Sequence, residues 1–142
     1  MATTRPLAPQ PIKESAVDVR FRSIAAQVII PYGSIGCNDA GAAKPFTDAL
    51  FQAGATLLGC SMGTYDNLAI NAVTAKDMLF RRACDVLLPK AKAGDVPTAA
   101  AVGKEISLED NETVKATKGN TDVGVTLLEI LPGGAGYRVR LP

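Results

Sequence analysis

The side chains with the most reactive chemistry in this sequence are the thiols of Cys37, Cys60 and Cys84. They are odd in number and widely spaced, a pattern that does not suit a disulfide framework. A structural zinc site would need a fourth ligand. Histidine is absent, which excludes Cys–His and Ser–His catalytic pairs. We therefore expect three thiols that pack as small apolar side chains, as is usual in a reducing cytosol.

Two stretches match nucleotide-binding motifs only in part. The string "TAAAVGKE" has Thr98 where a P-loop needs glycine, and Glu105 where it needs a hydroxyl. We reject nucleotide hydrolysis because both ends of the motif fail. The glycine-rich string "GSIGCNDAGAAK" (33–44) lacks the GxGxxG pattern, so we interpret it as a plain loop.

The charged side chains give little sign of a catalytic site. Acid–base catalysis needs two carboxyl groups in distinct environments, whereas Glu109, Asp110 and Glu112 crowd one polar turn. The neighbours Arg81 and Arg82 could bind an anion, but in a strand they would point to opposite faces. The net charge of +1 gives no reason to expect nucleic acid as a direct partner. We predict no catalytic residue, no metal site and no cofactor.

A chain of 142 residues with 47% hydrophobic and 20% charged residues is typical of one globular domain. Residues 1–15 hold three prolines and several polar residues, which predicts an extended N-terminal arm. Residues 16–142 are expected to form a single β-rich domain. No apolar run is long enough to span a membrane, and the first residues lack the apolar core of a secretory signal. We expect no membrane partner and synthesis in the cytoplasm.

Two segments between residues 44 and 88 are predicted from turn signals as well as from the spacing of apolar residues. Residues 44–54 predict a short helix, with Pro45 in its first turn and Gly54 at its end. Residues 67–88 could form one long helix by composition. Their apolar positions keep no helical stripe, however, and we favour short strands. The expected strands are Leu68–Ile70, Met78–Phe80 and Cys84–Leu88.

Alternating patterns predict the other strands. Val17, Val19 and Phe21 alternate with charged residues near the start of the domain, and the same alternation closes the chain at residues 137–141. Between residues 104 and 131, apolar runs are separated by turn residues about every ten positions, which is typical of a small barrel or sandwich. The fold prediction is therefore mainly β, a small β-barrel or β-sandwich with one or two short helices and the N-terminal arm.

The second half of the chain resembles a known family in four segments: "AGATLLGCSMG", "DVLLPKA", "AVGKEISLEDNETVKATKGNTDVGVTLLEI" and "GYRVRLP". Together they resemble the small capsid decoration, or cement, proteins of tailed bacteriophages. The resemblance runs from Gly54 to Leu141, and its best parts are "GNTDVGVTLLE" and "YRVRL". The segment from Val28 to Phe51 has no counterpart in that pattern.

The resemblance implies a β-tulip-like fold and a homotrimer that sits on the outer surface of the phage head. The partner would be the major capsid protein, whose adjacent subunits the trimer would clamp, so the protein would be part of the virion. An extended arm can add a strand to an exposed sheet edge of that partner. On this reading we assign capsid contact to the arm and to the first strand, and neighbour contact to the last strand. The capsid-contact residues are Arg5, Pro6, Leu7, Pro9, Pro11, Ile12, Val17, Val19 and Phe21, and the neighbour-contact residues are Arg138 and Arg140.

Two alternatives stay open at this point. The first is a different virion part, a β-barrel at the head–tail junction or in a tail or host-attachment structure. The second is a hydrolase that would use Cys37 or Asp39. A catalytic thiolate would react quickly with thiol reagents at neutral pH, whereas a buried thiol would not.

Overall fold

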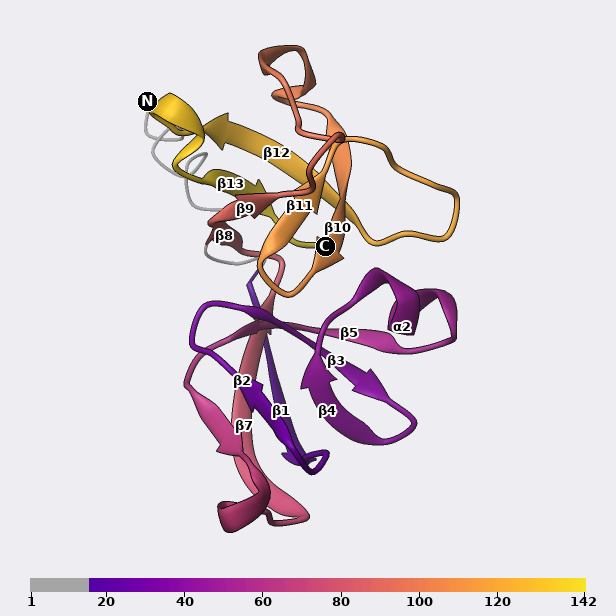
Figure 1. The fold of residues 1–142 in the computed structure, drawn as a ribbon, viewed down its shortest axis with the longest axis vertical. Coiled ribbons are helices and arrows are strands. Elements are labelled where there is room, and N and C mark those ends of the chain that lie inside the picture. The colour runs from indigo at the N-terminus through magenta and orange to yellow at the C-terminus, as the bar shows by residue number, and fades with distance from the viewer. Residues whose placement is uncertain (1–15) are drawn as a thin grey trace, which may run out of the picture.

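The computed structural model describes residues 16–142, and it is mainly β, as predicted. The predicted N-terminal arm, residues 1–15, lies outside the described residues. Three antiparallel or mixed sheets carry the fold, and within residues 16–142 they do not close into a complete barrel. Figure 1 shows a lower part built from the first half of the chain and an upper part built from the second half.

The lower part is a five-stranded antiparallel sheet, here called the N-terminal sheet. Its two edges approach each other where Ile24 forms an isolated bridge with Ala43, so the sheet curls strongly. A two-stranded sheet lies beside it, and Phe80 is fully buried in the core between them. In spatial order the large sheet has β1 (Val17–Ser23), β7 (Ala75–Arg82), β5 (Thr56–Ser61), β3 (Ile35–Asp39) and β4 (Ala42–Pro45), and the small one has β2 (Val28–Ile30) and β6 (Tyr65–Asn67).

The upper part is a six-stranded sheet, here called the C-terminal sheet. The strands expected between residues 104 and 141 all lie in this sheet, but β12 pairs with β10 and not with β11, so they do not form a simple meander. The last strand lies inside the sheet rather than at its edge. In spatial order its strands are β8 (Asp85–Leu88), β13 (Tyr137–Arg140), β12 (Gly124–Ile130), β10 (Glu105–Asp110), β11 (Thr113–Lys115) and β9 (Lys90–Ala91).

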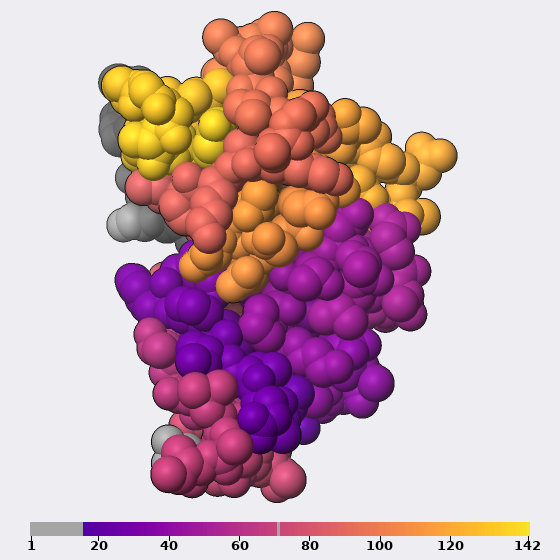
Figure 2. All heavy atoms as spheres, viewed as in Figure 1, coloured from indigo at the N-terminus to yellow at the C-terminus, as the bar shows by residue number. Residues whose placement is uncertain are grey.

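The main hydrophobic core joins the two parts. Ile35, Cys37 and Phe46 from the first half of the chain are fully buried in one cluster with Leu108, Leu127 and other residues of the C-terminal sheet. Burial of apolar area is the dominant favourable term in folding. Because this cluster is shared, the two sheets stabilise each other, and the close contact of the two parts is visible in Figure 2.

The predicted short helix is present as α2 (Asp48–Gln52). Thr47 begins it, because its Oγ1 accepts a hydrogen bond from the Leu50 N–H at 3.1 Å. Pro45 was predicted to lie in the first turn of this helix, but it is the last residue of strand β4. The remaining helical turns that the structure describes are η2 (Ala69–Asn71), η3 (Ala99–Ala101) and η4 (Pro132–Gly134).

Two predictions for the first half were wrong. The expected strand Leu68–Ile70 is replaced by the turn η2, since Asn67 binds the loop with its side chain: its Nδ2 donates to Val73 O at 2.9 Å. The stretch 33–44, interpreted as a loop, is the hairpin β3–β4. Its turn places Ala40 and Gly41 at φ 52° and 95°, the left-handed conformation that two-residue hairpin turns need.

The other strand predictions for residues 67–88 hold with shifted ends. Met78–Phe80 lies within β7, and Cys84–Leu88 corresponds to β8. The two strands are joined by Ala83 and Cys84, and Ala83 has a φ of 54°. This connection takes the chain from the N-terminal sheet into the C-terminal sheet (Figure 1).

Candidate interaction sites

The first predicted contact strand, β1, is an edge strand of the N-terminal sheet. Val19 and Phe21 lie opposite Phe80 and Met78 of β7 and pack partly buried against the smaller core cluster. Val17 is 43% exposed. Of the described residues assigned to capsid contact, Val17 is therefore the most accessible, while Val19 and Phe21 also hold the strand in place. The assigned residues between Arg5 and Ile12 lie outside the described residues.

Two of the three charged side chains of β1, Asp18 and Arg22, form ion pairs within the chain. Arg81 Nε contacts Asp18 Oδ1 at 2.8 Å, and its hydrogen bond lowers the pKa of the Asp18 carboxyl. Arg22 Nε contacts Asp77 Oδ1 at 3.0 Å, with both side chains largely exposed. Exposed pairs of this kind contribute little to stability, so β1 keeps a polar outer face that can rearrange against a partner.

The two arginines assigned to neighbour contact lie on the outer face of the C-terminal sheet. Arg138 Nε contacts Glu129 Oε1 at 3.1 Å, and Arg140 Nε contacts Asp85 Oδ1 at 2.7 Å. Their neighbours in sequence, Tyr137 and Val139, are buried. The predicted alternation of core and outer side chains in β13 is confirmed, and the arginines are held in place by intrachain ion pairs.

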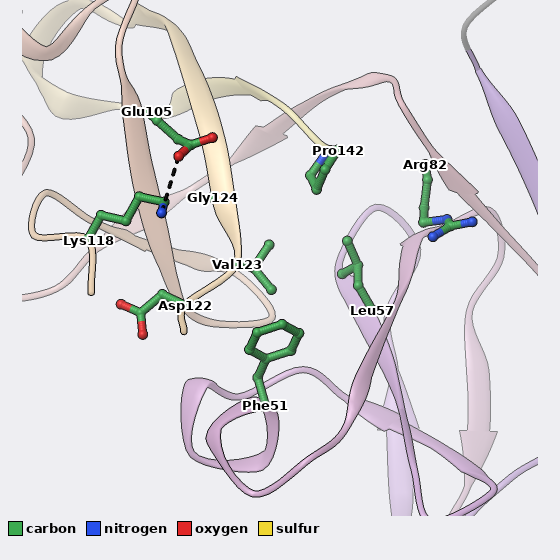
Figure 3. Close-up of a pocket in the computed structure, with 9 residues that line it drawn as sticks. All are labelled: Phe51, Leu57, Arg82, Glu105, Lys118, Asp122, Val123, Gly124 and Pro142. Atoms are coloured by element: carbon green, nitrogen blue, oxygen red, sulfur yellow. Dashed lines mark ion pairs between the residues drawn. The ribbon is translucent and has the colours of Figure 1, made fainter. Parts of the chain in front are cut away.

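A hollow of about 370 Å³ lies where the two sheets meet (Figure 3). Its floor is apolar and includes Phe51, Leu57 and Val123, and charged side chains stand around it. Figure 3 shows Arg82 on one side and the ion pair of Lys118 with Glu105 on the other. The full lining is Phe51, Leu57, Arg82, Glu105, Lys118, Asp122, Val123, Gly124 and Pro142.

Arg82 is the lining residue whose charge is least satisfied. Its Nε is buried and has no hydrogen-bond partner, and among residues 16–142 no carboxylate lies within ion-pair distance of it. Its neighbour Arg81 points to a different environment and pairs with Asp18, as expected for adjacent residues of a strand. Guanidinium groups suit carboxylates, so the hollow can receive an acidic group with an apolar neighbour.

A second polar cluster joins helix α2 to the C-terminal sheet. Lys115, which is 9% exposed, places its Nζ at 2.8 Å from Asp48, 3.4 Å from Glu109 and 3.8 Å from Asp122. Burial alone would lower the pKa of Lys115, but the three carboxylates raise it above its ordinary value. The cluster fixes the position of α2 and hence of Phe51 in the hollow.

Asp122 gives this cluster a dependence on pH. The backbone N–H of Gly119 donates to it at 2.9 Å, and this bond, with Lys115 and Ser107, holds the pKa of Asp122 below its ordinary value of 3.8. A lowered pKa in the folded state stabilises the fold above the unfolded value, and the contribution is lost as the pH falls through the folded value.

We expect Asp122→Asn to lower the free energy of unfolding by about 2 kcal/mol at pH 7, because a charged hydrogen-bond acceptor is lost. The difference between the variant and the parent should shrink as the pH falls from 5 to 2. Urea unfolding across this range measures it. An undiminished difference at pH 2 would contradict the assignment.

The cysteines are in environments that keep them protonated. Burial raises the pKa of the Cys37 and Cys60 thiols to about 11, and it raises that of Cys84 as well. A reactive cysteine needs a lowered pKa, so this geometry does not favour Cys37 as a nucleophile. All three thiols are free. In residues 16–142, no group of three or more cysteine, aspartate and glutamate side chains could hold a metal ion.

Compared with protein-family models, curated protein sequences and solved structures, the chain gives no match. Within the part of the chain that the structure describes, no helix has the length and apolar character needed to cross a membrane.

Proposed function

We propose that this protein is a capsid decoration protein, a homotrimer that binds the outer surface of a phage head and clamps adjacent major capsid subunits. The observation that carries the proposal is the sheet formed by the segments of the resemblance. "GNTDVGVTLLE" supplies β12, and "YRVRL" supplies β13, its direct neighbour. The two best-matching segments thus form one structural unit.

The surface chemistry supports a role in binding rather than in catalysis. The described chain offers an edge strand with the exposed Val17, a hollow with the unpaired Arg82, and thiols whose pKa is raised. A clamp needs several modest contacts that act together, because attachment through three copies multiplies their effect. The copy number per particle distinguishes this function from the tail-module alternative, since a decoration protein covers the head and a tail component does not.

The test combines the mass in solution with binding to purified expanded heads that lack the protein. The full chain should be a trimer and should sediment with the heads to saturation, and removal of residues 1–15 should weaken binding. A monomer that ignores the heads, with or without residues 1–15, would contradict the proposal.

A matched pair of variants locates the contact on the described part of the chain. Val17 and Val102 are exposed to the same degree, 43% and 44%, but Val17 lies in strand β1 and Val102 in the turn between η3 and β10. Val17→Lys should reduce head binding several-fold, while Val102→Lys should leave it unchanged. Equal effects of the two changes would remove β1 from the contact surface.

A further inference from the structure

Strand β8 has one edge whose backbone groups have no partner in the described chain. Leu141 N–H donates to Cys84 O at 2.9 Å, and hydrogen-bonded pairs alternate along an antiparallel ladder. Val86 and Leu88 therefore face β13 with their N–H and C=O groups, and Asp85 and Leu87 turn theirs away from it.

The pairing of β13 with β12 leads to the same conclusion about the outward edge of β8. Leu131 N–H donates to Gly136 O at 2.9 Å, so the alternation assigns the backbone groups of Arg138 to β12. Arg138 lies opposite Leu87 in the register of β13 and β8, which leaves Leu87 facing outward. In residues 16–142 no backbone or side-chain hydrogen bond reaches the N–H of Asp85 or Leu87.

A groove runs along this edge. Two hollows of about 290 and 300 Å³ share Tyr32, Gly33 and Leu87 and together follow β8 over its whole length. Val86 and Leu88 are buried, while Asp85 and Leu87 are exposed. Residues of both faces of the strand line the hollows, so the groove lies at the strand edge rather than on one face.

The opposite wall of the groove is held firmly. Gly33 N–H donates to Ser61 O at 2.9 Å, and Ser61 N–H donates to Ser34 O at 2.7 Å. Tyr32 stands on this wall and is 67% exposed. The groove is thus preformed and presents an aromatic ring, which lowers the cost of ordering an incoming segment.

The lining determines which segment would fit. Met62, Leu87 and Leu88 give it an apolar centre, and Asp85 and Glu112 lie toward its two ends. Asp85 also pairs with Arg140, and Glu112 with Lys90, but no lysine or arginine lines the groove itself. An extended peptide with an apolar centre and a basic residue matches both features.

We propose that the outer edge of β8 binds an extended segment of the capsid partner, which adds a strand to the C-terminal sheet. This inference rests on the proposed function and names the surface and the chemistry of the contact. Main-chain hydrogen bonds to Asp85 and Leu87 supply affinity, and the groove selects the side chains. The strand is short, which is how exposed edges are usually kept from pairing indiscriminately.

The decisive experiment compares Leu87→Pro with Leu87→Ala in binding to expanded heads. Proline removes the outward N–H and is tolerated in an edge strand when that N–H faces away from the sheet. Alanine shortens the side chain but keeps the N–H. We expect proline to weaken binding at least about tenfold, and alanine by no more than about threefold.

Each outcome decides a different point. If the parent chain does not bind heads, the proposed function and this inference both fall. If the parent binds and Leu87→Pro binds equally well, the function stands and the strand addition is wrong. Equal losses in both variants would mean a side-chain contact and would also overturn it. Should Leu87→Pro fail to fold, amide exchange at Asp85 and Leu87 in the parent must slow on head binding, and unchanged exchange would refute the inference.

Discussion

Replacing Gly59 with alanine is expected to destabilise the fold by about 4 kcal/mol, because strain and overpacking act at the same position. Gly59 has φ +126°, and an added Cβ would lie 2.4 Å from the carbonyl oxygen of Arg81 in the adjacent strand. That oxygen belongs to the backbone of β7, which cannot move away without breaking its pairing with β1 and β5. Urea unfolding measures the difference in free energy.

Gly41→Ala is the matched control for this prediction. Gly41 has φ +95°, but nothing lies within 4 Å of an added Cβ. The Gly41→Ala variant should therefore lose only the conformational cost of a positive φ, about 1–2 kcal/mol of unfolding free energy. If the two variants lose the same stability, close packing of β5 against β7 is not what requires glycine at position 59.

Replacing Lys115 with methionine is expected to lower the free energy of unfolding by about 3 kcal/mol at pH 7. Removal of one partner from a buried ion cluster leaves the remaining charges with less compensation, although Glu109 keeps Lys92 at 3.5 Å. Here Asp48, Glu109 and Asp122 would keep their charges next to an apolar side chain. Their repulsion should raise the pKa of Asp122, so the loss should become smaller as the pH falls toward 3.

Lys118→Met provides the comparison, because Lys118 pairs with the exposed Glu105 at 3.2 Å. A surface pair is worth less than about 1 kcal/mol. Urea unfolding of both variants at pH 7 and pH 3 tests the argument. If Lys118→Met costs as much as Lys115→Met, burial of the cluster does not determine its contribution.

The strands were predictable where one face of a strand is buried and the other is not. In β13, the arginines alternate with Tyr137 and Val139, and the structure follows that pattern. The hairpin β3–β4 was missed because β3 does not alternate between buried and exposed residues, since Ile35, Gly36 and Cys37 are all buried. In addition, Ala40 adopts a positive φ that alanine rarely shows. Local composition cannot reveal a turn that is imposed by pairing.

The candidate sites were less predictable than the fold, since their parts come together only through tertiary contacts. Asp48 and Lys115 are 67 residues apart, and nothing near Lys115 in the sequence marks it as buried. The hollow beside Arg82 combines Phe51 of α2 with Gly124 of β12. The adjacent arginines were the one available signal, and they indicated only that the two side chains would face different surroundings.

The internal position of β13 also bears on the rate at which this chain folds. Asp85 and Arg140, which lie opposite each other in β8 and β13, are 55 residues apart, and Asp18 and Arg81 of β1 and β7 are 63 apart. Chains dominated by such distant pairings typically fold in milliseconds to seconds. Until β13 joins the sheet, both edges of β8 are unpaired, and intermediates of this kind tend to aggregate. Refolding from denaturant should therefore give the highest yield of native protein at low protein concentration.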